Sequence, residues 1–80
     1  MRYRPLGATG LELPEIAFGC GDNAGLMIAG SPEQQAAAVA YAYERGLTYF
    51  DTAAGYGSTV SEANLGRALA ATGIRPIICT

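Results

Sequence analysis

The spacing of apolar and polar positions along the 80-residue chain predicts two helices separated by short apolar runs. The longer helical stretch follows Ser31 and Pro32, and Gln34 completes a capping-box pattern three residues after the serine. Within "EQQAAAVAYAYER" the apolar side chains recur with helical spacing, and Gly46 can end the helix in a left-handed conformation. The stripe consists of Ala36, Val39, Ala40 and Tyr43. We therefore predict a helix between Ser31 and Gly46 with one face on a core.

A second helix is predicted in "EANLGRALAA", beginning near Ser58 or Ser61 and ending at Gly73. Apolar runs precede, separate and follow the two helices, and each has the composition of a strand. They are "EIAFG" (15–19), "LTYF" (47–50) and "RPIICT" (75–80). Because these runs do not alternate with polar residues, they are typical of strands covered on both faces.

The beginning of the chain predicts a small hairpin, since "RYRPLGATGLEL" (2–13) places two extended runs around a Gly-Ala-Thr-Gly turn. Residues 19–30 carry several glycines and are expected to form a loop. The order of hairpin, strand, helix, strand, helix and strand predicts an α/β fold with a parallel sheet. Three parallel strands alone leave two open edges, which favours pairing with a further part of a sheet.

Composition narrows the function classes. Half of the residues are apolar and 15% are charged, which excludes a disordered tail. The cations are all arginine and are scattered along a chain of net charge −2, so no nucleic-acid interface is predicted. The apolar runs are much shorter than the roughly 20 residues of a membrane span. The start of the chain lacks the apolar segment of a secretory signal, so we expect a cytoplasmic protein with reduced thiols.

The two cysteines, Cys20 and Cys79, form no CxxC pair, and neither a metal site nor a redox motif is predicted. If the first and third strands flank the second, the two residues lie about 9–10 Å apart. A disulfide requires Cα atoms within about 7 Å of each other. We therefore predict no bridge.

The most informative stretch is "YFDTAAGYGSTVSEANLG" (49–66), in which Asp51 ends an apolar run and Tyr56 lies in the following loop. Parallel α/β folds bind ligands at the carboxyl ends of their strands, so both side chains are expected on the functional face. At this level two interpretations stay open. The residues are either a catalytic pair, or Asp51 stabilises a turn through its side chain and Tyr56 packs on the sheet.

The stretch resembles the signature of the aldo-keto reductases. The matching positions are Gly46, Phe50, Asp51, Thr52, Ala53, Tyr56, Gly57, Ser61, Glu62, Leu65 and Gly66. The opening "YRPLGATGLELPEIAFGCG" is similar to the family's N-terminal hairpin and first barrel strand, so the resemblance spans almost the whole chain. It implies that residues 1–80 are the N-terminal part of a (β/α)8 TIM barrel. That part comprises the hairpin (about 2–13), the first three barrel strands and two helices.

The resemblance also implies an oxidoreductase that interconverts carbonyls and alcohols with NADP or NAD. Its substrates would be small aldehydes, ketones or sugars. Within this resemblance the stretch "DTAAGYG" favours aldose-type substrates. Asp51 and Tyr56 match the acid and the tyrosine of the family's Asp, Tyr, Lys and His tetrad. In that tetrad the tyrosine delivers a proton to the carbonyl oxygen, and the lysine ammonium favours the phenolate form. Gly19, Cys20 and Gly21 are expected near the nicotinamide together with Asp51.

The sequence departs from the family pattern because it contains neither lysine nor histidine. Relatives commonly carry the tetrad lysine directly after a threonine at the end of the third strand, and this chain ends "PIICT". We therefore expect a truncation just before the lysine and no activity from the isolated chain. Barrels of this type run to roughly 250 residues, so the remainder of the barrel is expected to be needed for stability.

A non-catalytic alternative is a small Rossmann-like module that binds a nucleotide or a partner. "GCGDNA" (19–24) fits the dinucleotide fingerprint, but that fingerprint requires a helix opening at its last positions. The capping signals place the helix start at Ser31 instead. Two further interpretations are that Arg67 is a solvated charge and that the glycine-rich loop (21–30) borders the substrate pocket.

Overall fold

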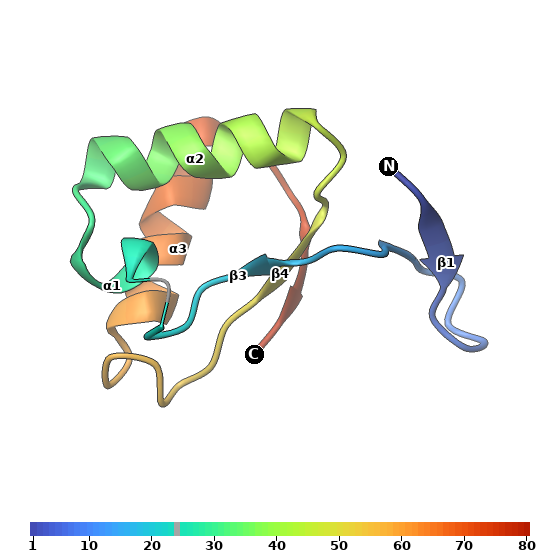
Figure 1. Ribbon diagram of the computed structural model, residues 1–80, viewed down its shortest axis with the longest axis horizontal. Helices are drawn as coiled ribbons and strands as arrows, with labels where there is room; N and C mark the ends of the chain where they lie inside the picture. The colour runs from blue at the N-terminus through green and yellow to red at the C-terminus, as the bar shows by residue number, and fades with distance from the viewer. Residues whose placement is uncertain (24) are drawn as a thin grey trace.

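The computed structural model describes residues 1–23 and 25–80, which form five strands and three helices (Figure 1). In chain order they are β1 (Tyr3–Pro5), β2 (Glu12–Pro14), β3 (Phe18–Gly19), α1 (Leu26–Ala29), α2 (Pro32–Glu44), β4 (Tyr49–Asp51), α3 (Val60–Thr72) and β5 (Ile77–Cys79). Apart from α1, this is the predicted order. The chain is therefore an α/β unit, as expected from its pattern of apolar positions.

The sheet is parallel, with strand order β3-β4-β5, so the middle strand in sequence is also the middle strand in space. Asp51 lies opposite Gly19 on one side and Cys79 on the other. The ladder continues past the strand ends, because the Cys20 N–H donates to the Asp51 carbonyl at 2.9 Å. The carboxyl ends of all three strands consequently meet at one edge of the sheet.

Both cysteines carry free thiols, and β4 lies between the two strands that lead to them. Cys20 is buried whereas Cys79 is exposed. The prediction that no disulfide joins them is confirmed for this chain. The predicted reason also holds, because β4 separates the two strands.

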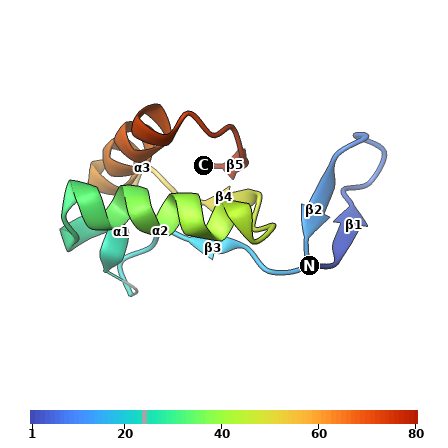
Figure 2. The ribbon, with the colours of Figure 1, turned by 90° about the horizontal axis from the view of Figure 1, so that it is seen from above.

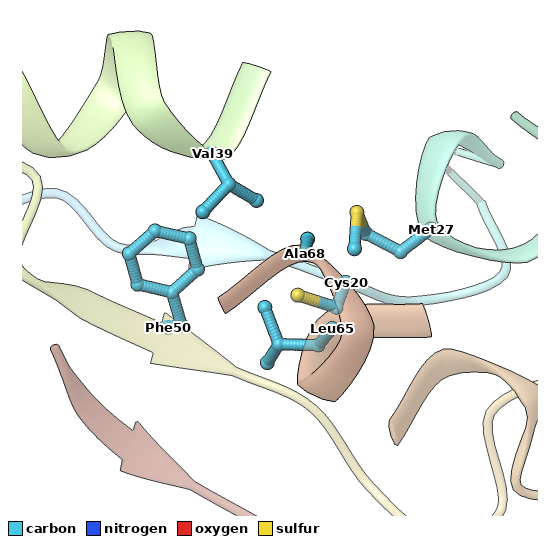
Figure 3. Close-up of a cluster of buried hydrophobic side chains, with 6 residues drawn as sticks. All are labelled: Cys20, Met27, Val39, Phe50, Leu65 and Ala68. Carbon is cyan, nitrogen blue, oxygen red and sulfur yellow. The ribbon is translucent and has the colours of Figure 1, made fainter. Parts of the chain in front are cut away.

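The core lies between β4 and the helices and includes Phe50 of the central strand (Figure 3). Phe50 is fully buried and stacks on Phe18 of β3, with ring centroids 4.8 Å apart. The rest of the buried cluster comes from all three helices and the end of β3: Cys20, Met27, Val39, Leu65 and Ala68. Side chains alternate along a strand, so Tyr49 and Asp51 project from the opposite face. Within the described residues the helices cover one face of the sheet, and cover of the other face stays a prediction.

Helix α2 begins and ends as predicted. The Ser31 hydroxyl accepts from the Gln34 N–H, the Gln34 side chain accepts from the Ser31 N–H, and Pro32 is the first helical residue. After the helix, Gly46 adopts φ 94°. Its carbonyl accepts from the Tyr3 hydroxyl at 2.8 Å, which ties the hairpin to the α2–β4 turn.

The hairpin β1–β2 pairs antiparallel, with Tyr3 opposite Pro14, and it lies to one side of the helices and the parallel sheet (Figure 2). The predicted hairpin is therefore present, with strands that start and end within a residue of the predicted range. The Glu15 N–H also donates to the Arg2 carbonyl at 2.8 Å, which prolongs the pairing by one step.

The parallel strands and α3 differ in extent from the prediction, and α1 was not predicted. The parallel strands are shorter than their apolar runs, and β4 extends to Asp51. The predicted loop 19–30 contains α1, whose carbonyls are bonded by side chains from α2 and α3, a tertiary contact that the local sequence does not reveal. Helix α3 begins at Val60, between the two serines near which it was predicted to begin, after a left-handed Thr59 without a side-chain cap.

Candidate active site

A cavity of about 430 Å³ opens at the carboxyl edge of the parallel sheet. It is lined by Gly19, Cys20, Gly21, Asp22, Asn23, Asp51 and Tyr56. Every residue that the sequence pointed to as catalytic or cofactor-binding is in this set. Asp22 and Asn23 were not singled out from the sequence, although the prediction that the glycine-rich loop (21–30) borders a pocket includes them.

Asp51 reaches the cavity because it is the last residue of the central strand. Its side chain leaves the sheet on the face opposite Phe50, and it is half-buried. Its neighbours across the ladder are Gly19 and Cys79. A glycine beside the acid leaves open space, since a Cβ built on Gly19 would meet nothing within 4 Å.

Tyr56 reaches the same cavity from the loop after β4. Its N–H donates to the Ala53 carbonyl at 3.2 Å, and its carbonyl accepts from the Ser61 N–H at 3.2 Å. The ring lies against Gly21, where an added Cβ would be 3.7 Å from the ring carbons. The tyrosine ring and Gly21 therefore face each other, and a side chain at position 21 would touch the ring.

The loop that presents Tyr56 turns through left-handed residues. Gly57, Ser58 and Thr59 have φ values of 59°, 53° and 76°. A left-handed conformation costs a non-glycine residue roughly 1–2 kcal/mol, and such strained residues cluster at functional sites. Gly57 also needs to lack a side chain, because a Cβ there would lie 2.8 Å from the Ile28 Cδ1 atom.

A buried polar chain joins the strand ends to α3 behind the cavity. The Ser61 hydroxyl donates to the Cys20 carbonyl at 2.8 Å, so the Thr52 hydroxyl, 2.8 Å away, donates to Ser61. Both side chains are buried. From the sequence, Ser61 was considered only as a possible start of a helix, and its hydrogen bonds to Thr52 and Cys20 were missed. The sequence did contain one indication of this role, because Thr52 and Ser61 belong to the same motif. At the exposed rim, the Thr80 hydroxyl donates to Glu62, in the first turn of α3.

The Cys20 thiol is held in its neutral form. Burial raises its pKa from 9.0 to about 11, and the nearby Asp51 carboxylate adds to the increase. Because the thiolate is disfavoured, Cys20 is a packing residue of the cavity floor and a poor nucleophile at neutral pH.

The raised pKa of Cys20 predicts a loss of stability at alkaline pH. The unfolded chain releases this proton near pH 9 and the folded chain near pH 11. The thiol therefore contributes its full stability below pH 9 and loses it as the pH rises to 11. We expect Cys20→Ala to flatten the fall in the free energy of urea unfolding over this interval. Met27→Ala, which truncates a core neighbour without removing a titratable group, should keep the wild-type slope; equal slopes in both variants would contradict the assignment.

The cavity contains proton-exchanging groups without a balancing cation. Among its described lining residues the titratable side chains are Cys20, Asp22, Asp51 and Tyr56, and none is an arginine. A phenol and a carboxylate in one cavity are groups that can bind and transfer protons, and none of the described lining side chains is a cation that could pair with a phosphate. Over residues 1–23 and 25–80 there is no group of three or more His, Cys, Asp or Glu side chains suited to a metal ion. In the same part of the chain, every helix is too short or too polar to cross a membrane.

Comparison with known proteins gives one family. The family model described as "Aldo/keto reductase family" matches residues 15–80. The chain is 38% identical over 65 residues to probable aldo-keto reductase 1 of Glycine max, covering 80% of the chain and 19% of that protein. It is 35% identical over 71 residues to L-galactose dehydrogenase of Arabidopsis thaliana, covering 89% and 22%. It is 39% identical over 71 residues to L-glyceraldehyde 3-phosphate reductase of Escherichia coli K12, covering 86% and 20%. The chain thus spans about a fifth of the length of these relatives.

Proposed function

The chain belongs to the aldo/keto reductase family, and from this premise we propose that it supplies Asp51 and Tyr56 to the active site of an NAD(P)-dependent oxidoreductase. The observation that carries the proposal is their position in one cavity at the carboxyl edge of a parallel sheet. In this proposal the sheet β3-β4-β5 is the first part of a (β/α)8 barrel. The outer edges of β3 and β5 then pair with further barrel strands, which add to the stability of the three-stranded sheet.

Tyr56 is the proton donor in the proposed reaction. When a carbonyl is reduced, negative charge develops on its oxygen, and a phenol within hydrogen-bond reach transfers a proton there. A phenol donates this proton more readily when a cation stabilises the phenolate. The chain contains neither lysine nor histidine, and the described cavity lining holds no cation. We therefore assign that cation to residues outside 1–80, and we assign Asp51 the role of holding it beside the phenol.

The described lining suits the nicotinamide end of NADP or NAD. A volume of about 430 Å³ falls within the roughly 300–1,000 Å³ typical of small-molecule sites. The glycines at 19 and 21 flank Cys20 and leave room for a flat ring beside Asp51. When bound, the cofactor supplies or accepts the hydride. Its phosphates require positive groups, which we place beyond the described lining residues.

The proposed substrates are small aldehydes, ketones and sugars. The names of two relatives, an L-galactose dehydrogenase and an L-glyceraldehyde 3-phosphate reductase, support an aldose-type substrate for this chain. The Rossmann-like alternative is not favoured, because the turn 19–23 leads into a helix of four residues rather than a long helix that could receive a pyrophosphate. The last position of that fingerprint, Ala24, lies outside the described residues.

The test is a chimera in which this chain replaces the matching segment of the E. coli relative, assayed with L-glyceraldehyde 3-phosphate and a reduced nicotinamide. We expect turnover by the chimera and none by the isolated 80-residue chain above a Tyr56→Phe version of it. Circular dichroism establishes that the chimera is folded. A folded chimera that binds the nicotinamide and does not turn over would overturn the proposal.

A further inference from the structure

The short helix α1 is held by side chains that come from the two long helices. The Gln35 Nε2 atom donates to the Leu26 carbonyl at 2.9 Å and to the Gly30 carbonyl at 3.0 Å. The Asn64 Nδ2 atom donates to the Met27 carbonyl at 2.7 Å. The last carbonyls of a helix have no partner within it. A helix of four residues therefore depends on these bonds from α2 and α3 to stay formed.

Arg67 determines which way both amides point. Its Nη2 atom donates to the Gln35 Oε1 atom at 3.0 Å and to the Asn64 Oδ1 atom at 2.8 Å. A guanidinium has donors only, so it binds the oxygen end of each amide and directs the nitrogen end at α1. Gln35 is fully buried with Arg67 in place, so in the folded chain its Oε1 atom bonds to the guanidinium and not to water. Arg67 is exposed, as the interpretation of a solvated charge requires, but its guanidinium also binds two amides, which that interpretation did not include.

Helix α1 contacts both sides of the Asp51–Tyr56 cavity. On one side the Gly25 N–H donates to the Gly21 carbonyl at 3.4 Å, and the Ala29 N–H donates to the Gly25 carbonyl at 2.8 Å. This links the helix to the wall on which the Tyr56 ring rests. On the other side Ile28 packs against Gly57, the residue after the tyrosine. A displacement of α1 would shift the wall and the Tyr56 loop together.

We propose that Arg67 is a positioning residue for the Asp51–Tyr56 cavity. It does not line the cavity and acts through Gln35 and Asn64, which fix α1. Its effect on the geometry of the cavity is independent of any reaction. Its effect on catalysis rests on the proposed function, because only there does the Tyr56 ring act on a substrate.

The Cys20 thiol provides a native reporter for this effect. Cys20 is 1% exposed and packs in the cluster that contains Met27 of α1, so a thiol reagent reaches it when α1 leaves its place. The exposed second thiol is removed by using Cys79→Ser as the background. In this background we compare Arg67→Met, which keeps the aliphatic length, with Arg75→Met, the same change at an exposed position before β5.

We expect Arg67→Met to speed iodoacetamide modification of Cys20 under native conditions by roughly ten-fold or more, the factor by which hydrogen bonds to charged groups change an equilibrium. The factor by which the modification rate rises should exceed the factor by which the global unfolding constant, measured with urea, rises. If Arg67 only stabilised the fold as a whole, the two factors would be equal. Arg75→Met should leave the rate unchanged. Arg67→Lys, whose ammonium can also donate to both oxygens but without a planar fork, should fall between Arg67→Met and the parent.

Asn64→Asp is the second variant, and it keeps the acceptor for Arg67 while losing the donor to the Met27 carbonyl. It should also accelerate the modification of Cys20, and it carries the test if Arg67→Met does not fold. Because thiol modification needs no turnover, an inactive chimera would leave this result intact, and the two proposals can fail separately. Rates that match those of the Arg75→Met control, or that rise only in proportion to the global unfolding constant, would overturn the role of Arg67.

Discussion

A Tyr56→Phe substitution in the chimeric reductase is expected to lower kcat by about 100- to 10,000-fold, the range that a positioned general acid contributes. Phenylalanine keeps the ring that packs against Gly21, so the loop and the cavity wall should stay in place. The hydroxyl is the only group removed. The loss should therefore appear in the chemical step, with a much smaller change in the affinity for the nicotinamide. Steady-state kinetics with the aldehyde varied at saturating nicotinamide measures both quantities.

The matched control is Tyr41→Phe, which removes a hydroxyl from an exposed tyrosine on α2. The Tyr41 side chain is 60% exposed, and its ring lies 4.5 Å from the Arg45 guanidinium carbon, an arrangement that phenylalanine can retain. We expect the kinetics of this variant to equal those of its parent. If Tyr56→Phe also retained full kcat, the proton would have to come from another group, and the role assigned to Tyr56 would be lost.

A Phe50→Ala substitution is expected to remove most of the stability of the 80-residue chain. The ring is fully buried in the core and stacks on Phe18. Phenylalanine-to-alanine changes in cores cost about 3–5 kcal/mol. A domain of this length has only about 4–12 kcal/mol of unfolding free energy, from roughly 0.05–0.15 kcal/mol per residue. Urea unfolding followed by circular dichroism should show a midpoint close to zero denaturant, or no folded baseline.

Ile16→Ala provides the control for Phe50→Ala. Ile16 is also a large apolar residue, but it is 61% exposed, so its truncation should change the free energy of unfolding by less than 1 kcal/mol, as is usual for surface substitutions. Similar losses from the two variants would mean that the chain has no specific core around the central strand. A small loss from Phe50→Ala alone would mean that the cluster seen in Figure 3 refills readily.

Apart from α1, the order of the elements followed from the sequence, and so did every residue of the cavity lining except Asp22 and Asn23. Local signals were strong for α2, where Ser31, Pro32 and Gln34 make a capping box, and for the parallel sheet, whose apolar runs alternate with helices. Asp51 and Tyr56 could be placed together because strand ends and the loops after them share one edge of a parallel sheet. The helix signals are local and involve only a few residues. The shared edge follows from the parallel order of the strands.

The tertiary structure alone decided the features that depend on contacts between distant residues. Helix α1 exists because Gln35 and Asn64 reach its carbonyls, and four residues cannot stabilise a helix by local bonds. Arg67 faces outward by its helical position, yet its guanidinium reaches two amides that lie 32 and three residues away in the chain. The left-handed turn at Ser58 and Thr59 likewise runs against local preference, and the Thr59 N–H donates to the Ala54 carbonyl at 2.9 Å. Propensities set the elements, whereas long-range hydrogen bonds and packing set their precise placement around the cavity.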